Sequence, residues 1–410
     1  MADAAVVIGV GPGGRRAAAA LVAAGRPVVL LQIEPLAHPE VPVGRGVAEA
    51  RPMLDALFDG FREVEATRAV VMHGRVHALP LSRAEIARMF KPGELPGAAV
   101  QWARTRGGIE LKKLLGGGHE QRTYADWIVQ RYGAPALDRL FGPYCRKRFG
   151  EPGEVSCNAA RLAHATPFDG PWLAPTRPDV SLDGVDVREG VRVEAVRAGE
   201  VVTADGPVTG DVFVDVPPAR MVGWIDDAGA LATDVATLVA RDVVQVTVRG
   251  GDELPFEVHV LDADVPFWRL TRPGLLHDGL AGTVCAHFTV DAGAPDEDWV
   301  AATLAGLERC GVRGADAAGA RVQRVRAQCP VWTGNHLVRM RRYLLAMEER
   351  EITPVGVAGL HAPIDLAQEL AWLEAMTGPT RPPLRETMRA LIEPPVLDPE
   401  RSRLTRFVER

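Results

Sequence analysis

The chain opens with an unbroken apolar run that leads into glycine. Residues 5–8 are apolar, an alanine-rich segment covers 17–24, and a second apolar run covers 28–31. The first run and the alanines are separated by three spaced glycines, Gly9, Gly11 and Gly14. Short apolar runs bounded by glycine are typical of buried parallel strands, and the segment between them is long enough for a helix. The pattern therefore predicts a strand, a tight turn, a helix and a second strand.

A turn with this glycine spacing suits the diphosphate of a dinucleotide. The first glycine permits the turn, the second lets backbone N–H groups approach the diphosphate, and the third lets the helix pack on the strand. The helix N-terminus adds a partial positive charge. A strand–helix–strand unit with an empty crevice remains the alternative, because glycine spacing alone does not prove a ligand.

The residues at the end of the second strand are those expected to contact the ribose of the dinucleotide. Dinucleotide folds usually place an acid there, and this chain has Gln32, with Glu34 shortly after it. A glutamine amide can still hydrogen-bond a hydroxyl, and Glu34 lies on the same side of an extended strand. Residues 33–36 contain no arginine, which disfavours a cofactor with a 2′-phosphate.

The remaining segments alternate between helix and strand patterns. Helical patterns cover 53–65, most of 82–148, 297–310 and 365–376. Strand patterns cover 69–79, 185–216, 240–290 and 353–359, and turns at 198–199 and 205–206 make the second group a β-meander. The predicted fold class is α/β with mixed α+β character: a Rossmann-type FAD/NAD(P)-binding domain with a β-meander, plus a mixed substrate-binding lobe.

This pattern also predicts how the chain is divided between domains. We assign residues 1–74, 185–239 and 350–378 to the dinucleotide-binding domain. Residues 75–184 and 240–349 are assigned to the helical and β substrate-binding lobe, and 379–410 to a surface tail. The first domain would thus be assembled from segments far apart in the sequence.

Composition and charge limit the kinds of partner that the protein could bind. A net charge of -6 argues against nucleic acid, because binding phosphate backbones needs a basic surface. The five cysteines show no metal-ligand spacing and are typical of reduced thiols, so we expect a cytoplasmic protein. We expect no membrane span, because the apolar runs are too short. The expected partner is a small-molecule substrate, and a homodimer is left open.

Several separate segments together resemble one family. Residues 124–127 and 141–150 are similar to its "edWlxxrFG…fxPYxxKvwG" stretch, and 214–217 to its "visTxP" strand end. Residues 266–273 resemble its "pFhRvsrp" segment, and 329–332 its "YPVY" segment. On these motifs, which span about residues 4–377, the chain resembles the protoporphyrinogen oxidase-like and UDP-galactopyranose mutase-like branch of the FAD-binding amine oxidase superfamily.

The resemblance implies an extended FAD in the first domain, beneath a substrate-binding lobe. It implies that the glycines of the turn face the diphosphate, that the backbone of Val193 meets the adenine, and that Gly359 and the helix beginning at Asp365 face the diphosphate and the flavin. The cofactor-binding set predicted in this way is Gly9, Gly11, Gly14, Gln32, Glu34, Arg45, Val193, Gly359 and Asp365.

The sequence departs from the family around the flavin ring. The family's acid is Gln32 here, and its glycine run beneath the ring is reduced to a remnant around Arg45. The first tyrosine of "YPVY" is Cys329, and a family glutamate is His287. We therefore expect FAD to be bound weakly or to have been lost.

Three residues are candidates for catalysis. His287 lies in a strand pattern and could act as an acid or base, although such a histidine is more often structural. Arg269 lies in the segment that the resemblance places at the substrate lobe, where an arginine suits an anionic or carbonyl group. Cys329 could be a nucleophile, but buried free cysteines are commonly inert.

Two classes of function follow. The first is an FAD-dependent oxidoreductase, like the amine and protoporphyrinogen oxidases, acting on a small, specialised metabolite. The second is a flavin-less or flavin-poor descendant of the fold that catalyses a non-redox step such as cyclisation or isomerisation, or that serves as a partner protein.

Overall fold

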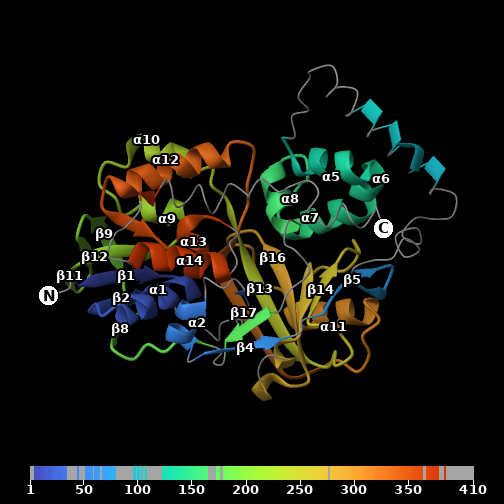
Figure 1. Cartoon of the computed structure of the whole chain (residues 1–410), viewed down its shortest axis with the longest axis horizontal. Helices are drawn as coiled ribbons and strands as arrows, with labels where there is room; N and C mark the ends of the chain where they lie inside the picture. Colours follow the sequence, from blue (N-terminus) through green and yellow to red (C-terminus); the bar gives the residue numbers. More distant parts are fainter. Residues whose placement is uncertain are drawn as a thin grey trace.

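The structure is a computed structural model of the whole chain. It describes residues 4–34, 44–45, 51–58, 60–64, 67–79, 122–164, 172–175, 179–275, 278–362, 366–377 and 383–384, with short pieces at 96–97, 99–101, 103–104 and 107–108. Everything below concerns these residues. Figure 1 shows a parallel sheet at the left, a second sheet at the centre and right, and a group of helices above the second sheet.

The first sheet is parallel and has five strands in the order β18-β12-β1-β2-β8. Its strands are β1 (Ala5–Gly9), β2 (Val28–Gln32), β8 (Val185–Glu189), β12 (Asp211–Asp215) and β18 (Ile352–Pro354). Their apolar residues are largely buried, as expected for a parallel sheet covered on both faces. The order reverses at β1, so the carboxyl end of β1 is where such folds place a ligand crevice.

Helices and a small antiparallel sheet complete this part. Helix α1 (Pro12–Ala23) connects β1 to β2, and α13 (Gly356–Leu360) and α14 (Leu366–Thr377) pack against α1. The predicted β-meander forms a three-stranded sheet of β9 (Val193–Arg197), β10 (Glu200–Thr203) and β11 (Gly206–Thr209). Segments far apart in the sequence thus form one sheet.

Two predicted elements differ from the structure. The last strand was expected over 353–359, but it ends at Pro354 and helix α13 begins at Gly356. Gly356 has φ 67°, which turns the chain out of the strand. The helix expected over 53–65 ends earlier: α2 covers Arg51–Phe58, and strand β4 covers Phe61–Val64. Short apolar runs do not distinguish a strand from a helix by periodicity alone.

The second sheet has seven strands in the order β17-β13-β16-β15-β14-β5-β6. They are β5 (Arg68–Met72), β6 (Arg75–Ala78), β13 (Ala240–Arg249), β14 (Glu257–Val260), β15 (Arg269–Thr271), β16 (Thr283–Val290) and β17 (Asp316–Pro330). The hairpin of β5 and β6 belongs to this sheet, so the boundary predicted at residue 74 divides a hairpin. The other predicted domain boundaries stay predictions.

The two faces of the seven-stranded sheet differ in chemistry. One face carries valine, leucine and alanine side chains and packs against helix α11 (Trp299–Arg309). The opposite face carries polar side chains and meets helix α7 (Gly142–Arg148). Helix α7 belongs to the group with α5 (Tyr124–Tyr132) and α8 (Cys157–His164), and Thr123 caps the N-terminus of α5 in a capping box.

Strand β17 links the two sheets. It runs for 15 residues and pairs with β13 from Asp316 to Pro330. It also contacts α13, which packs against β12 of the first sheet. Helix α12 (His336–Glu348) follows it and leads to β18. Neither β17 nor α12 was predicted from the sequence.

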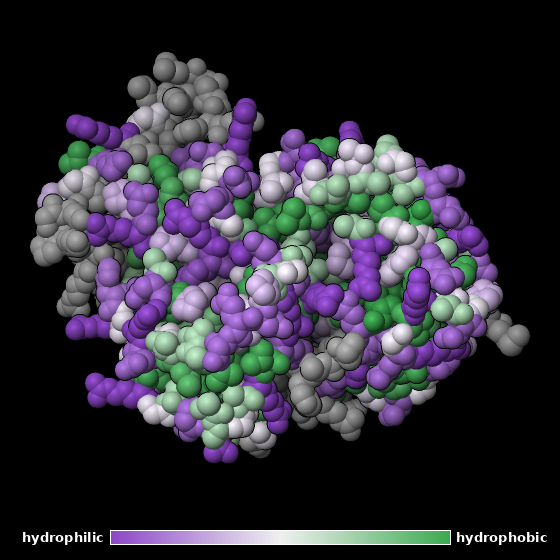
Figure 2. Space-filling view, turned by 180° about the vertical axis from the view of Figure 1, so that it is seen from behind, coloured by the Kyte–Doolittle hydropathy of each residue, from purple (hydrophilic) through white to green (hydrophobic). Residues whose placement is uncertain are grey.

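The face of the molecule seen from behind is mostly polar (Figure 2). Figure 2 shows hydrophilic residues over most of the back of the molecule, with hydrophobic residues gathered in smaller areas on both halves. Among the described helices, none combines the length and apolar character needed to cross a bilayer.

Candidate functional site

The glycine turn at the carboxyl end of β1 is closely packed. A Cβ added at Gly14 would lie 2.9 Å from the Cα of Gly9, so only glycine lets α1 approach β1 this closely. A Cβ at Gly13 would lie 2.7 Å from the Cα of Gly356 at the start of α13. The turn is therefore held between β1 and α13.

The inner side of this turn is occupied by the carboxylate of Asp215, the last residue of β12. Its Oδ2 accepts a hydrogen bond of 2.7 Å from the Gly14 amide, and the Gly359 amide also donates to this carboxylate. A Cβ at Gly11 would lie 3.3 Å from Oδ2, and a Cβ at Gly356 would clash with Oδ1. Helix α1 has no capping side chain of its own, so Asp215 caps it from another strand.

The surroundings of Asp215 are buried and charged. Burial raises its pKa to about 7, and the negative charge of Glu369 adds to this effect. Arg16 acts in the opposite direction and forms two hydrogen bonds with Glu369, of 2.9 and 2.6 Å. Near neutral pH, Asp215 therefore exists in both protonation states.

The end of β2 carries a second polar cluster. Gln32 is buried, its Nε2 donates to the Glu34 carbonyl at 3.1 Å, and its Oε1 has no partner among the described residues. The Glu34 carboxylate pairs with Arg220 at 2.5 Å and with Arg326 at 3.3 Å. The sequence contained no local arginine, but the fold brings two from distant elements.

The other predicted cofactor residues lie at different places. The amide of Gly190 donates to the Gln32 carbonyl at 2.8 Å, so the segment leading to Val193 passes the end of β2. Gly359 lies in α13 against the carbonyl of Val214, and added side-chain atoms there would clash with it. Arg45 lies in the short strand β3 (Gly44–Arg45), which pairs with β7 (Trp172–Pro175). Asp365 lies outside the described residues.

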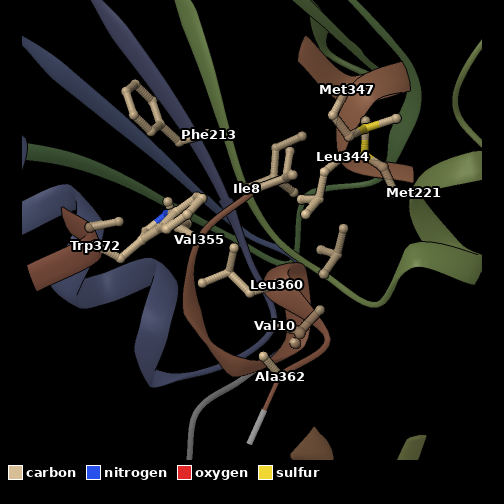
Figure 3. Close-up of a cluster of buried hydrophobic side chains, with 14 of the residues drawn as sticks. Ile8, Val10, Phe213, Met221, Leu344, Met347, Val355, Leu360, Ala362 and Trp372 are labelled. Carbon is tan, nitrogen blue, oxygen red and sulfur yellow. The ribbon is translucent and has the colours of Figure 1, made fainter. Parts of the chain in front are cut away.

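These residues do not fit the diphosphate of FAD. The α1 amide of Gly14 already bonds a carboxylate, and Glu34 already bonds two guanidinium groups. Two like charges about 5 Å apart repel by roughly 3 kcal/mol at an effective dielectric constant near 20. Beyond the end of β1, Val10, Leu360 and Ala362 meet in the buried apolar cluster of Figure 3. The ribose end does offer one vacant acceptor, Gln32 Oε1.

A second candidate site lies on the polar face of the seven-stranded sheet. Four directly paired residues form a row across its strands, and directly paired side chains share a face. The row comprises His259, Arg269, His287 and Gln245. A neighbouring row comprises Arg68, Glu257, Thr271 and Cys285. The structure thus brings two predicted catalytic candidates, Arg269 and His287, into contact.

His287 is fully buried within this row. Arg269 Nη2 lies 3.3 Å from His287 Nδ1, and Thr271 Oγ1 lies 3.0 Å from His287 Nε2. Burial lowers the pKa of His287 well below its usual value, and the charges of Arg269 and Arg148 lower it further. Because a guanidinium only donates, His287 Nδ1 accepts and Nε2 carries the proton. This arrangement suits a neutral histidine that positions Arg269.

A tyrosine–histidine pair lies beside this row. Tyr144 Oη accepts a 2.9 Å hydrogen bond from Arg148 Nη1 and lies 3.3 Å from His259 Nδ1. His259 Nε2 faces Glu257 Oε2 at 3.7 Å. Burial lowers the pKa of His259 to about 4, partly offset by Glu257.

Sequence reasoning missed Tyr144, Arg148, Glu257 and His259. Tyr144 and Arg148 are one helical turn apart, and Glu257 and His259 alternate along a strand. This spacing was a usable signal, but only the fold shows that α7 faces β14.

Cys329 lies at the end of β17, between the two sites. Its Sγ lies 3.3 Å from the carbonyl of Arg148, to which it donates. Burial raises its pKa, so the thiol rather than the reactive thiolate is favoured. The adjacent Gln328 has Oε1 3.9 Å from the position of a Cβ on Gly11. Strand β17 thus contacts both sites within a few residues.

Several solved structures have a similar overall fold. Reduced UDP-galactopyranose mutase matches with a TM-score of 0.71 and 12% identity, over 95% of this chain and 97% of that one. A protoporphyrinogen oxidase-like protein from Exiguobacterium sp. 255-15 matches with a TM-score of 0.61 and 15% identity, over 92% and 99%. A CLA-producing fatty acid isomerase from P. acnes matches with a TM-score of 0.54 and 13% identity, over 91% and 97%.

The chain therefore shares its fold with these three proteins. The predicted resemblance is confirmed at the level of the fold, as is the α/β class with a Rossmann-type domain. No protein-family model and no curated protein matches the sequence. Within the described part of the chain, no group of three His, Cys, Asp or Glu side chains could hold a metal ion.

Proposed function

We propose that the protein is an enzyme that isomerises a small anionic molecule by acid–base chemistry at the polar face of the seven-stranded sheet. The single observation that carries this proposal is Arg148. Its guanidinium has no acidic partner among the described residues, and its buried Nε has no acceptor. A cation in this state favours an anionic ligand.

The surroundings of Arg148 suit a flat anionic group. Its guanidinium carbon lies 4.3 Å from the centre of the Trp268 ring and 4.7 Å from that of Phe149. Arg269 contacts the same Trp268 ring at 4.9 Å. A carboxylate or an enolate oxygen placed near Trp268 would lie within reach of both guanidinium groups, whose planar donors suit bidentate binding.

Tyr144 and His259 supply the acid and the base. His259 is neutral near pH 7, because burial lowers its pKa to about 4, and its side chain is 21% exposed. It can take a proton from a carbon next to a carbonyl and return it to a neighbouring carbon, so the substrate keeps its formula. Tyr144 lies between His259 and Arg148 and can donate a hydrogen bond to either the base or the substrate oxygen.

Substrate binding would itself strengthen the base. The charges of Arg68, Arg148 and Arg269 hold the pKa of His259 down, after burial. An anion paired with Arg148 would neutralise part of this positive charge and raise the pKa of His259. The site therefore couples binding of a negative charge to proton transfer.

Proton exchange with solvent tests this proposal. A panel of small oxo acids is incubated with the protein in D₂O, and loss of C–H signal is followed by NMR. The wild type should accelerate exchange for at least one acid. His259→Gln should slow it by about 100-fold or more, because general bases contribute about 10²–10⁴.

Arg148→Met gives the second arm. It should weaken the apparent affinity for that acid by about tenfold or more, because hydrogen bonds to charged groups contribute about 1.5–3 kcal/mol. Arg146→Met is the matched control, since Arg146 lies on the same helix, is half exposed and pairs with Glu151. Equal loss in both variants, or no exchange with any acid of the panel, contradicts the proposal.

An FAD-dependent oxidoreductase is the second candidate. The observation that favours it is the vacant acceptor of Gln32 at the end of β2, where a ribose hydroxyl would donate. A visible flavin spectrum of the purified protein, with one FAD per chain, would support it. A colourless preparation favours the non-redox function.

A further inference from the structure

We propose that Asp215 is the residue that decides whether the crevice at the glycine turn accepts a dinucleotide, and that the carboxylate form excludes the diphosphate. The argument rests on where the carboxylate lies. It bonds the Gly14 amide at 2.7 Å, in the first turn of α1, where anions are favoured. A helix N-terminus that already holds one anion offers little to a second.

The packing around Asp215 shows that its carboxylate is in close contact with the glycine turn. The Oδ2 atom lies 3.0 Å from the position of a Cβ on Gly13 and 3.3 Å from that on Gly11. On its other side, Oδ1 lies against Gly356 and would clash with a Cβ there. Only 1% of Asp215 is exposed, so water does not screen its charge from a ligand in the crevice.

In the described part of the chain, two other charged groups face Asp215. Arg16 lies on α1 and Glu369 on α14, and Arg16 donates to the Glu369 carboxylate through Nε and Nη2. Arg16 is thereby committed to Glu369 and does not neutralise Asp215 fully. Protonation of Asp215 removes its negative charge. The Gly14 amide can then donate to a phosphate oxygen in place of the carboxylate. Binding of a diphosphate and protonation of Asp215 are therefore linked.

Calorimetric titration of FAD and of ADP-ribose tests this inference without any assay of activity, so its outcome is independent of the proposed function. The two ligands share the adenosine diphosphate, whose charge is constant over the range used. With Asp215 titrating at about pH 7, wild-type affinity should fall about thirtyfold from about pH 6 to about pH 8.5. ADP-ribose should show the same dependence, because it lacks the flavin ring.

Two variants complete the experiment. Asp215→Asn should bind both ligands at least tenfold more tightly than the wild type at about pH 8.5, with little pH dependence. Asp211→Asn, at the opposite end of the same strand and paired with Arg26, should behave as the wild type.

Two results would overturn the inference. The first is tight wild-type binding of either ligand at the higher pH. The second is a folded Asp215→Asn protein that binds no better than Asp211→Asn. If Asp215→Asn does not fold, the test rests on the affinity of the wild type at each pH. A wild-type affinity that does not change with pH would then contradict the role of Asp215.

Discussion

At the scale of single residues, the most informative group is a carboxylate in a place where the sequence predicted a ligand. Asp215 was visible in the sequence only as the end of a strand that resembles "visTxP". Its contact with Gly14 joins positions 201 residues apart. No local pattern reports such a contact, because the fold creates it.

The burial of Asp215 predicts a pH dependence of stability. Its folded pKa, about 7, lies above the ordinary 3.8, so between these values the folded state holds a proton that the unfolded state has lost. The contribution of Asp215 is therefore fully present below the ordinary value and declines as the pH rises to about 7. The free energy of unfolding of the wild type, measured by urea at several pH values, should fall over this range relative to that of Asp215→Asn. Parallel curves for the two proteins would contradict this prediction.

Gly356 allows a second prediction at this scale. Gly356→Ala should lower the free energy of unfolding by more than about 2 kcal/mol, because it adds a clash with Asp215 to a left-handed backbone. Gly25→Ala is the control: Gly25 has φ 78°, and nothing lies within 4 Å of its added Cβ. It should lose only about 1–2 kcal/mol, the strain of the backbone alone. Equal losses in urea unfolding would show that the clash is relieved without cost.

At the scale of elements, strand β17 contacts both sites through Gln328 and Cys329 and was not predicted. Its residues at 316–324 are mostly exposed, so they lack the apolar alternation that identifies a strand. Near its end the pairing with β13 shifts, and Ala327 has φ 52°. This irregularity directs Gln328 toward the glycine turn and Cys329 toward Arg148. Bulges commonly redirect side chains in this way.

Asp242 holds this irregularity in place. Its carboxylate accepts hydrogen bonds of 2.9 Å from the Ala327 amide and from Arg324 Nε. Asp242→Ala should therefore cost about 2–4 kcal/mol in urea unfolding, because a buried amide and a guanidinium lose their acceptor. Asp316→Ala, at the exposed start of the same strand, should cost less than about 1 kcal/mol. A small loss at Asp242 would mean that neighbouring strands alone fix the bulge.

The elements that were predicted from the sequence have strong local signals. The first strand, α1, the meander and the strand pattern over 69–79 have either strong periodicity or glycine at turns. The strand expected over 353–359 was wrong because its apolar run continues through Gly356, where a backbone angle and not hydrophobicity ends the strand. For the site, the sequence singled out Arg269 and His287, but their partners depend on strand order.

At the scale of the whole molecule, ion pairs between distant segments contribute different amounts to the free energy of unfolding. The ion pair of Arg16 and Glu369 connects helix α1 near the start of the chain with helix α14 near its end, and both side chains are buried. Glu369→Ala should cost about 3–5 kcal/mol, because it leaves an unpaired buried charge. Arg326→Ala breaks a pair with Glu34 whose arginine is 66% exposed, and should cost less than about 1 kcal/mol. The midpoints of urea unfolding measure both, and similar shifts would contradict the assigned burial.

The packing of the glycine turn also bears on how such a chain could change over generations. Gly13, Gly14 and Gly356 are each needed for contacts made entirely within the protein, with Asp215, Gly9 and one another. A mutation at any of them would therefore impair folding whether or not a dinucleotide is bound. Selection for a folded chain would preserve this signature after a cofactor had been lost, and the motif would then record ancestry and not present chemistry.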